Sequence, residues 1–222
     1  DAKRALLIGI SHELRTPLSR LQLASEFVDD DTHREQLRDE VAEMQSIIDV
    51  LMVAETLNNR HAALNRESVD VEDLLRDLID QYFSSSTEQI ELSVRTQPLM
   101  ADIDPRRVLL LMKNLIGNAL RYGAADGSTV RVTAHEEAGT LVMCVLDEGP
   151  GLTDRQKAHF AEAFFRNEEA RDRASGGTGL GLYLSKTICI AHGGSLSFDP
   201  GYTQGACLVV RLPMTGPEPP EN

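Results

Sequence analysis

The chain has 222 residues, of which 41% are hydrophobic, and a formal net charge of −13. This length permits a sizeable core and one or two domains, and we expect two. The negative charge argues against an anionic membrane surface and against a nucleic-acid partner, because proteins bind phosphate backbones largely through Lys and Arg. No run approaches the roughly 20 apolar residues that span a bilayer, and no signal-peptide pattern is present.

The cysteines and most of the histidines give no sign of a transition-metal site. Cys144, Cys189 and Cys207 lie in apolar runs. A free thiol in such a run usually behaves as a small buried hydrophobic group rather than a redox or metal group, which fits a reducing cytoplasm. Five histidines have no partners at ligand spacing and are expected at the surface or at helix caps: His33, His61, His135, His159 and His192.

Residues 1–57 carry the pattern of two packed helices. Apolar or small residues recur at alternating spacings of three and four from Leu7 to Val28, and a second series runs from Leu37 to Leu51. The acidic, turn-prone break between them predicts an antiparallel α-helical hairpin. Because one hairpin leaves much apolar surface uncovered, two copies are expected to form a dimeric four-helix bundle, so we predict a homodimer.

A polar, aperiodic stretch at 58–68 is predicted to be a linker to a second domain at 69–213. Interleaved helical and strand patterns there predict an α/β two-layer sandwich. The Pro- and Glu-rich tail at 214–222 is expected to be disordered. The predicted helices are 69–83, 105–122 and 179–191, and the predicted strands are 90–95, 99–103, 129–135, 140–146, 195–198 and 206–212.

The motif Ser-His-Glu-Leu-Arg-Thr-Pro-Leu at 11–18 supplies a candidate nucleophile. The heptad pattern turns His12 away from the bundle axis and toward solvent. An unperturbed imidazole has a pKa of about 6.5, so at neutral pH it is mostly uncharged and keeps a lone pair for attack. Glu13 can hold one ring nitrogen and take its proton, and Thr16 lies one turn from His12 on the same face. Pro17 is expected to kink this helix.

The motif Asn-Leu-Ile-Gly-Asn-Ala-Leu-Arg-Tyr at 114–122 supplies candidate metal and nucleotide ligands. Asn114 and Asn118 are four residues apart and share one helix face, with Arg121 close by. A carboxamide oxygen is a neutral, hard ligand that suits Mg²⁺, so we predict Asn118 as the metal ligand. Tyr122 is expected either near the base or ribose or in the core.

The motif Asp-Glu-Gly-Pro-Gly at 147–151 follows an apolar strand. The carboxylate of Asp147 can accept a hydrogen bond from the adenine amino group, which favours ATP over GTP. Gly149 and Gly151 let the backbone approach the ring closely.

The motif Gly-Gly-Thr-Gly-Leu-Gly-Leu at 176–182 opens a helix and predicts a phosphate cradle of backbone N–H groups. No lysine follows the glycines as in a P-loop. The charged segment at 152–175 is expected to be an irregular lid that excludes water, with Arg166 touching phosphate or the helical domain. The predicted phosphate-contacting residues are Gly177, Thr178, Gly179, Leu180 and Gly181.

In their order and spacing these four motifs resemble the catalytic core of bacterial sensor histidine kinases, and the resemblance covers about residues 5–213. It implies a HisKA-type dimerisation and phosphoacceptor hairpin, followed by an ATP-binding domain of the GHKL (Bergerat) fold. It also implies phosphorylation of His12 by Mg·ATP and transfer of the phosphoryl group to an aspartate of a response regulator. By the same resemblance Glu13 is the base, and Thr16 helps place water for dephosphorylating the partner.

Two differences from related families bear on the alternative functions. Gyrase-like and chaperone ATPases carry a glutamate where this chain has Asn114, which speaks against a conformational ATPase. The usual Phe-Glu-Pro-Phe of the lid is replaced over 161–164, so a docking module or a phosphatase-biased core remains an alternative. The start of the chain opens directly into a helical pattern, and we expect a cytoplasmic portion of an inner-membrane protein, whose only membrane contact is through missing N-terminal segments.

Overall fold

The structure is a computed structural model and describes residues 14, 17–28, 30, 33–34, 37, 41, 44, 47–48, 64–123, 128–162 and 180–215. The chain divides into two units. The first comprises Asp1–Ala62 with Glu162–Leu180, and the second comprises Ala63–Ala161 with Gly181–Asn222.

The first unit is helical where it is described. Residues 17–25 form a helix that ends in a turn at 26–27. Several large apolar side chains of this unit are exposed, among them Leu21, Leu23 and Phe27, the last with 85% of its surface accessible. These exposed apolar side chains are the physical reason for expecting a second copy.

The second unit is built on a five-stranded sheet with the strand order β2-β4-β5-β7-β6. β2 and β4 are parallel and the other neighbours are antiparallel. β1 and β3 form a separate antiparallel pair. The strands are β1 (Glu67–Asp70), β2 (Ile90–Val94), β3 (Met100–Ile103), β4 (Val130–Glu137), β5 (Thr140–Leu146), β6 (Ser195–Phe198) and β7 (Cys207–Pro213).

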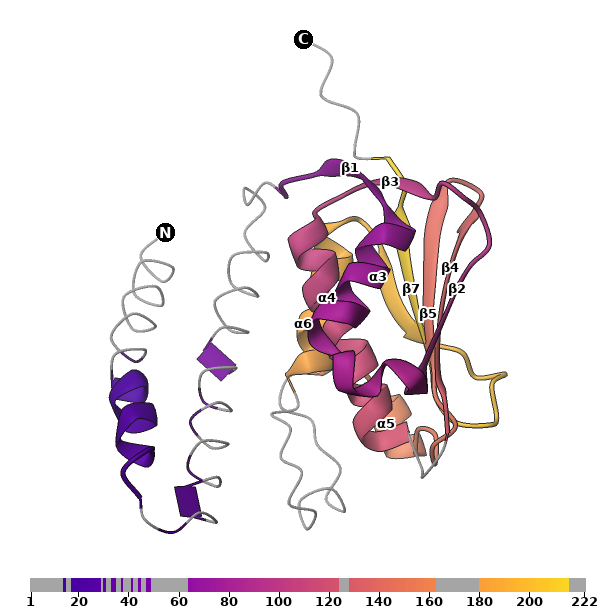
Figure 1. Cartoon of the computed structure of the whole chain (residues 1–222). Coiled ribbons are helices and arrows are strands. Elements are labelled where there is room, and N and C mark those ends of the chain that lie inside the picture. The colour runs from indigo at the N-terminus through magenta and orange to yellow at the C-terminus, as the bar shows by residue number, and fades with distance from the viewer. Residues whose placement is uncertain are drawn as a thin grey trace. The chain divides into compact units, whose positions relative to one another are not determined.

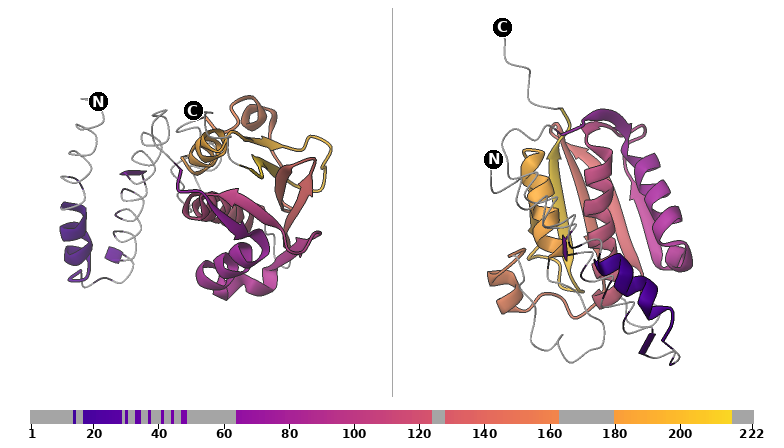
Figure 2. Two further views of the ribbon diagram at one scale, coloured as in Figure 1. Left: turned by 90° about the horizontal axis from the view of Figure 1, so that it is seen from above. Right: turned by 90° about the vertical axis from the view of Figure 1, so that its left-hand side faces the viewer.

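Helices α3, α4 and α6 lie side by side over one face of this sheet (Figures 1 and 2). The predicted α/β two-layer sandwich is thereby confirmed. Alternate strand residues point into the core between the layers, for example Val132 opposite Val145. The helices are α3 (Val71–Tyr82), α4 (Pro105–Asn118), α5 (Asp154–Ala158) and α6 (Gly181–Ala191), with a 3₁₀ helix at Ser84–Gln89 and a π-helical turn at Ala119–Gly123.

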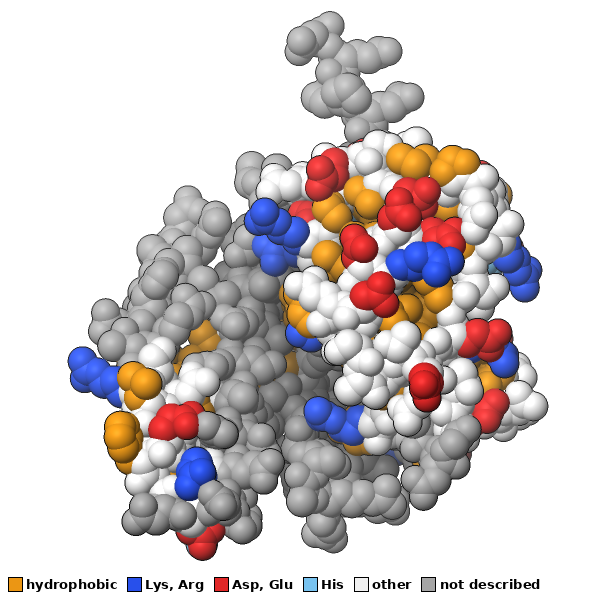
Figure 3. Space-filling model, in the orientation of Figure 1, with side chains coloured by type: hydrophobic (Ala, Val, Ile, Leu, Met, Phe, Trp, Pro, Cys, Tyr) orange, Lys and Arg blue, Asp and Glu red, His pale blue; other side chains and the backbone are white. Residues whose placement is uncertain are grey.

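Charged side chains of both signs are spread over this unit. On the face seen in Figure 3, Asp and Glu lie among Lys and Arg. None of the described helices is both long and apolar enough to cross a bilayer.

The start of α3 differs from the prediction. Asp70 caps the helix by accepting a hydrogen bond from the backbone N–H of Glu72 at 3.0 Å, so the helix begins at Val71 rather than at 69. The residues before the cap pair with β3, and residues 67–68 of the predicted linker therefore belong to a strand.

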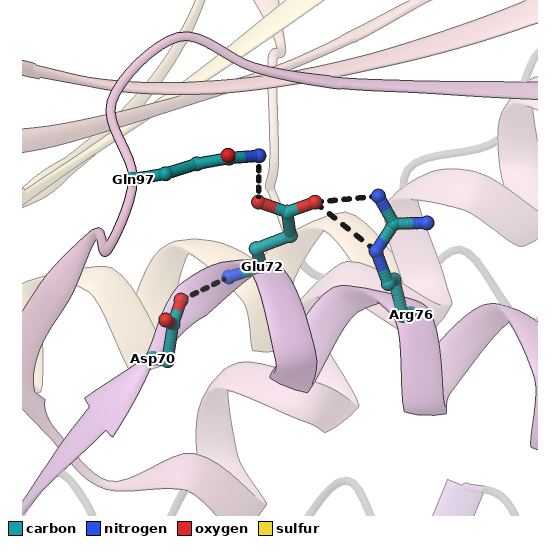
Figure 4. A network of polar contacts seen from close by, with 4 residues as sticks. All are labelled: Asp70, Glu72, Arg76 and Gln97. Atoms are coloured by element: carbon teal, nitrogen blue, oxygen red, sulfur yellow. Dashed lines mark hydrogen bonds and ion pairs between the residues drawn. The ribbon is translucent and has the colours of Figure 1, made fainter.

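A polar network holds the first turn of α3 to the loop that joins β2 and β3 (Figure 4). The Glu72 carboxylate accepts hydrogen bonds from Arg76, one turn on, and from Gln97 of that loop. Arg76 is the main cause of the lowered pKa of Glu72.

Two further boundaries were wrong in the prediction. Within the segment expected to be irregular, 154–158 form helix α5, which Thr153 and Gln156 cap reciprocally. At the start of the tail that was expected to be disordered, both backbone groups of Met214 form hydrogen bonds. Its N–H donates to the carbonyl of Gly139 at 3.0 Å, and its carbonyl accepts from the N–H of Asp102 at 2.8 Å.

The chain enters the second unit through a hydrogen-bonded anchor. Arg66 donates to the carbonyl of Asp102 at 2.9 Å and to that of His192 at 3.0 Å. The N–H of Asn65 donates to the carboxylate of Asp104 at 3.1 Å. Residues 65 and 66 are thus fixed to the start of α4 and the end of α6.

The prediction placed His192 at the surface or at a cap. It lies at the C-terminal cap of α6, but the surface alternative was wrong, because the residue is 2% exposed. Nε2 accepts a hydrogen bond from the N–H of Asp104 at 3.1 Å, and Nδ1 lies 2.9 Å from the carbonyl of Ile188, to which it donates. This pairing requires a neutral ring. Burial is the main cause of the lowered pKa of His192, and the nearby Arg66 charge lowers it further.

His192 therefore makes the stability of this domain depend on pH. The unfolded histidine binds a proton near pH 6.5, whereas the folded one, with its lowered pKa, resists protonation. Stability is full above that pH and is lost as pH falls below it. We expect His192→Asn to flatten the decline in thermal unfolding midpoint between pH 7 and pH 5, and His192→Ala to cost about 1–3 kcal/mol because the Asp104 N–H loses its acceptor. His135→Asn on β4 is the control; an equal flattening by that variant would contradict this assignment.

Candidate functional site

Asp147, directly after β5, is held by backbone groups from two directions. Its N–H donates to the carbonyl of Ala206 at 2.9 Å, which extends the β5–β7 pairing by one residue. Its Oδ1 accepts from the N–H of Gly149 at 2.9 Å and from the N–H of Ala206 at 3.0 Å. Two donors occupy Oδ1, so among the described residues the geometry leaves Oδ2 to accept a hydrogen bond from a ligand.

Glycines allow the chain to pack this closely around Asp147. A Cβ on Gly123 would lie 2.2 Å from the Asp147 Cβ, and one on Gly205 would lie 2.0 Å from the Asp147 carbonyl oxygen. A Cβ on Gly149 would lie 2.6 Å from the Gly123 Cα, and Gly151 has a φ of +72°. Sequence reasoning singled out Gly149 and Gly151 but missed Gly123, which directly follows the 114–122 motif, and Gly205 and the donor Ala206, which belong to a loop without a motif of its own.

Asn114 and Asn118 lie one turn apart on α4 and are half-buried. The side-chain Nδ2 of Asn114 is buried without a hydrogen-bond partner among the described residues. A Cβ on Gly181 would lie 3.8 Å from the Asn114 side chain, so the N-terminus of α6 meets α4 at this point. A buried donor without a partner is uncommon and is the kind of group that a bound ligand or water satisfies.

The π-helical turn at Ala119–Gly123 joins α4 to the Asp147 site. It replaces the last turn of the helix that the sequence predicted to continue to 122, and such turns are frequent at functional sites. The turn brings Gly123 against Asp147 and leaves Arg121 and Tyr122 at the surface. Tyr122 is 47% exposed, so its alternative role in the core does not hold.

Phe160, in the segment predicted to be a lid, contacts β6. The ring of Phe160 packs edge to face on Phe198, with 5.4 Å between centroids. Leu180 is buried. The remaining predicted site residues lie outside the described part of the chain: His12, Glu13, Thr16, Arg166, Gly177, Thr178 and Gly179.

The donor set suits Mg²⁺ rather than a transition metal. The described residues contain no group of three His, Cys, Asp or Glu side chains that could hold a metal ion. A single carboxamide oxygen from Asn118, with phosphate oxygens and water at the other positions, is a ligand set that Mg²⁺ accepts.

Two family models match the chain. Residues 103–216 match "Histidine kinase-, DNA gyrase B-, and HSP90-like ATPase". The chain belongs to this family. Residues 2–87 match the "His Kinase A (phospho-acceptor) domain", although the structure assigns the last part of that range, β1 and α3, to the α/β unit. The predicted resemblance to sensor histidine kinases is confirmed, and the ATP-binding family fits the arrangement around Asp147 and Asn114.

Curated relatives agree with this assignment. The chain is 31% identical over 216 residues to sensor protein RstB of Escherichia coli K12, covering 96% of this chain and 49% of RstB. It is 30% identical over 220 residues to sensor histidine kinase CpxA of the same organism, covering 96% of this chain and 47% of CpxA. The chain therefore spans about half the length of these relatives.

Solved structures support the fold. Full-length ShkA, solved in complex with AMPPNP, aligns with a TM-score of 0.77 and 24% identity over 98% of this chain and 47% of ShkA. The histidine kinase AdeS of Acinetobacter baumannii aligns with a TM-score of 0.68 and 22% identity over 92% of this chain and 98% of the AdeS chain.

The contact between Gly205 and Asp147 is testable. In Gly205→Ala the added Cβ displaces the Asp147 carbonyl, and we expect affinity for an ATP analogue, measured by calorimetry, to fall at least tenfold while circular dichroism keeps the fold. Gly117→Ala on α4 is the matched control, because nothing lies within 4 Å of its Cβ position. That variant is expected to bind as the parent does and to gain about 0.5–1 kcal/mol of stability. Unchanged affinity in Gly205→Ala would show that the site does not depend on this contact.

Proposed function

We propose that this chain is the core of a sensor histidine kinase, which phosphorylates His12 from Mg·ATP and passes the phosphoryl group to an aspartate of a response regulator. The observation that carries the proposal is the Asp147 carboxylate, with one oxygen fixed by two backbone N–H groups and the other left for a ligand, in the domain whose helix α4 carries the two asparagines.

The nucleotide would be recognised at both ends. Asp147 Oδ2 accepts from the adenine amino group, and the absence of side chains at Gly149 and Gly123 lets the backbone pack against Asp147 and hold its carboxylate in place. The phosphates lie toward the asparagines and the glycines before α6, where the buried Nδ2 of Asn114 supports a polar ligand. Mg²⁺ held by Asn118 supplies charge neutralisation at the phosphates.

The residue at 114 favours transfer to a protein group over hydrolysis. A carboxamide cannot take a proton from water, whereas the glutamate found there in gyrase-like ATPases can. In the proposed step a ring nitrogen of His12 attacks the γ-phosphorus. The N–P bond forms, the bond to the bridging oxygen breaks, ADP leaves, and Glu13 takes the proton from the other ring nitrogen. Thr16 would help place the water that hydrolyses the phosphoaspartate of the response regulator.

The partners follow from the first unit. Exposed apolar side chains such as Leu23 and Phe27 support dimerisation through the helical hairpin. The receiver domain of a response regulator would dock near His12. We propose that the full-length protein is held in the inner membrane by segments N-terminal to this chain, with the core on the cytoplasmic side.

The kinase proposal predicts incorporation of label from γ-labelled Mg·ATP into the purified chain. The label should be acid-labile and alkali-stable, and both His12→Gln and Asn118→Ala should reduce it at least a hundredfold. His33→Gln, an exposed histidine of the same unit, should leave it unchanged.

Other results of this labelling experiment would favour a different function or acceptor. Label that survives His12→Gln would mean a different acceptor. No label in the parent despite measurable ATP binding would favour the docking or phosphatase alternative, in which the altered lid does not deliver phosphate. Release of inorganic phosphate without label would favour the conformational ATPase.

A further inference from the structure

The sheet face opposite the helices carries two cysteines on neighbouring strands. Cys144 of β5 faces Thr133 of β4 directly and Cys207 of β7 diagonally, because Cys207 is paired with Leu146. Side chains two residues apart along a strand share one face, so these three side chains lie on the same side of the sheet. Cys144 is half-buried, whereas Cys207 is buried.

The neighbours of Cys144 favour its thiolate. The pKa of Cys144 is lowered, chiefly by its interaction with the neighbouring Cys207 thiol, with further help from the Thr133 hydroxyl and the Arg211 charge. Burial and the Asp199 charge act in the opposite direction without cancelling this. The pKa of Cys207 is raised by the same interaction.

Cys189 provides an internal comparison. It is buried in the core on α6, and burial raises its pKa to about 12. The sequence predicted the same buried, unreactive role for all three cysteines. That role holds for Cys189, but the half-exposed position and hydrogen-bonded sulfur of Cys144 contradict it there.

We propose that Cys144 and Cys207 form a thiol modification site that reacts with hydroperoxides. The Cys144 thiolate attacks one peroxide oxygen: the S–O bond forms, the O–O bond breaks, and the leaving oxygen takes up a proton to give water or an alcohol. Cys207 then attacks the Cys144 sulfur. The S–S bond forms, the S–O bond breaks, and the Cys207 proton leaves with the oxygen as water. The sulfurs lose two electrons and the peroxide gains two.

Oxidation at this site acts on Asp147. Diagonal neighbours in an antiparallel pair lie roughly 7–8 Å apart, whereas a disulfide brings Cα atoms to about 4.4–6.8 Å, so closure draws β5 and β7 together locally by about an ångström. Cys207 directly follows Ala206, whose N–H and carbonyl both bind Asp147. The disulfide is therefore expected to weaken nucleotide binding at least tenfold. This last step rests on the proposed function, but the thiol chemistry does not.

The first test follows alkylation of each cysteine in the full chain by iodoacetamide between pH 5.5 and pH 9.5, with peptide mass spectrometry. Cys144 is expected to react half-maximally at a lower pH than Cys207 and at least tenfold faster at pH 7 than Cys207, with Cys189 unlabelled. Cys207→Ala and Thr133→Val should each slow Cys144 at pH 7, and Ser93→Ala on β2 should not. Half-maximal reaction above pH 8.5, or equal rates at Cys144 and Cys207, would overturn the proposal.

The second test adds hydrogen peroxide. A Cys144–Cys207 cross-linked peptide is expected, and Cys207→Ser should instead leave a sulfenic acid that dimedone traps at Cys144. Affinity for an ATP analogue is measured before oxidation, after it, and after dithiothreitol. If affinity falls on oxidation and recovers with dithiothreitol in the parent but not in Cys144→Ser, the disulfide controls nucleotide binding. A disulfide that leaves the affinity unchanged overturns this coupling. Failure of the reduced parent to bind nucleotide would count against the proposed function alone.

Discussion

The α/β unit depends on how closely the backbone packs around the carboxylate of Asp147. One oxygen receives two backbone N–H groups, from Gly149 and Ala206, and the peptide N–H of Asp147 binds Ala206 in return. The bonds to Ala206 continue the β5–β7 ladder one residue past the end of β5. The bond to Gly149 turns the loop after β5 back toward Asp147. The backbone can approach the Asp147 carboxylate this closely only where the neighbouring residues lack side chains. Gly123, Gly149 and Gly205 are those residues.

The same packing connects the sheet to α4. Gly123 sits at the end of the π-helical turn, and its contact with Asp147 fixes where the helix stops. The buried face of α4, which includes Leu111 and Leu115, sets the rotation of the helix about its axis. Asn114 and Asn118 then lie at the edge of that face, on the side where Gly181 begins α6. Asp147 and Asn114, the proposed adenine and phosphate ligands, are therefore connected through packed elements of one domain.

Local patterns predicted much of this fold, and long-range contacts account for what they missed. The ranges of β5 and β6 follow from apolar runs between turns, and Asp104 with Pro105 marks the start of α4. The local sequence around Asp70 is compatible with either a strand or a helix. Only the pairing of β1 with β3 determines that the residue ends a strand and caps α3. Nothing local distinguishes His192 from a surface histidine, since its burial comes from Arg66 and Asp104, both distant in sequence. The motifs indicated Asp147. Gly205 and Ala206 could not be predicted from local patterns, because they reach Asp147 only through the pairing of β5 with β7.

The anchor at Asn65 and Arg66 limits where this unit can move relative to the chain before it. Both residues are hydrogen-bonded to the start of α4 and the end of α6, and β1 begins immediately afterwards. A linker running to residue 68 would let four more residues rotate freely, but breaking these bonds would leave the buried groups of Asp104 and His192 without partners. Any hinge for delivering phosphate must therefore lie before Asn65. Arg66 thereby ties the entry of the chain into this unit to the residues just before α4 and just after α6.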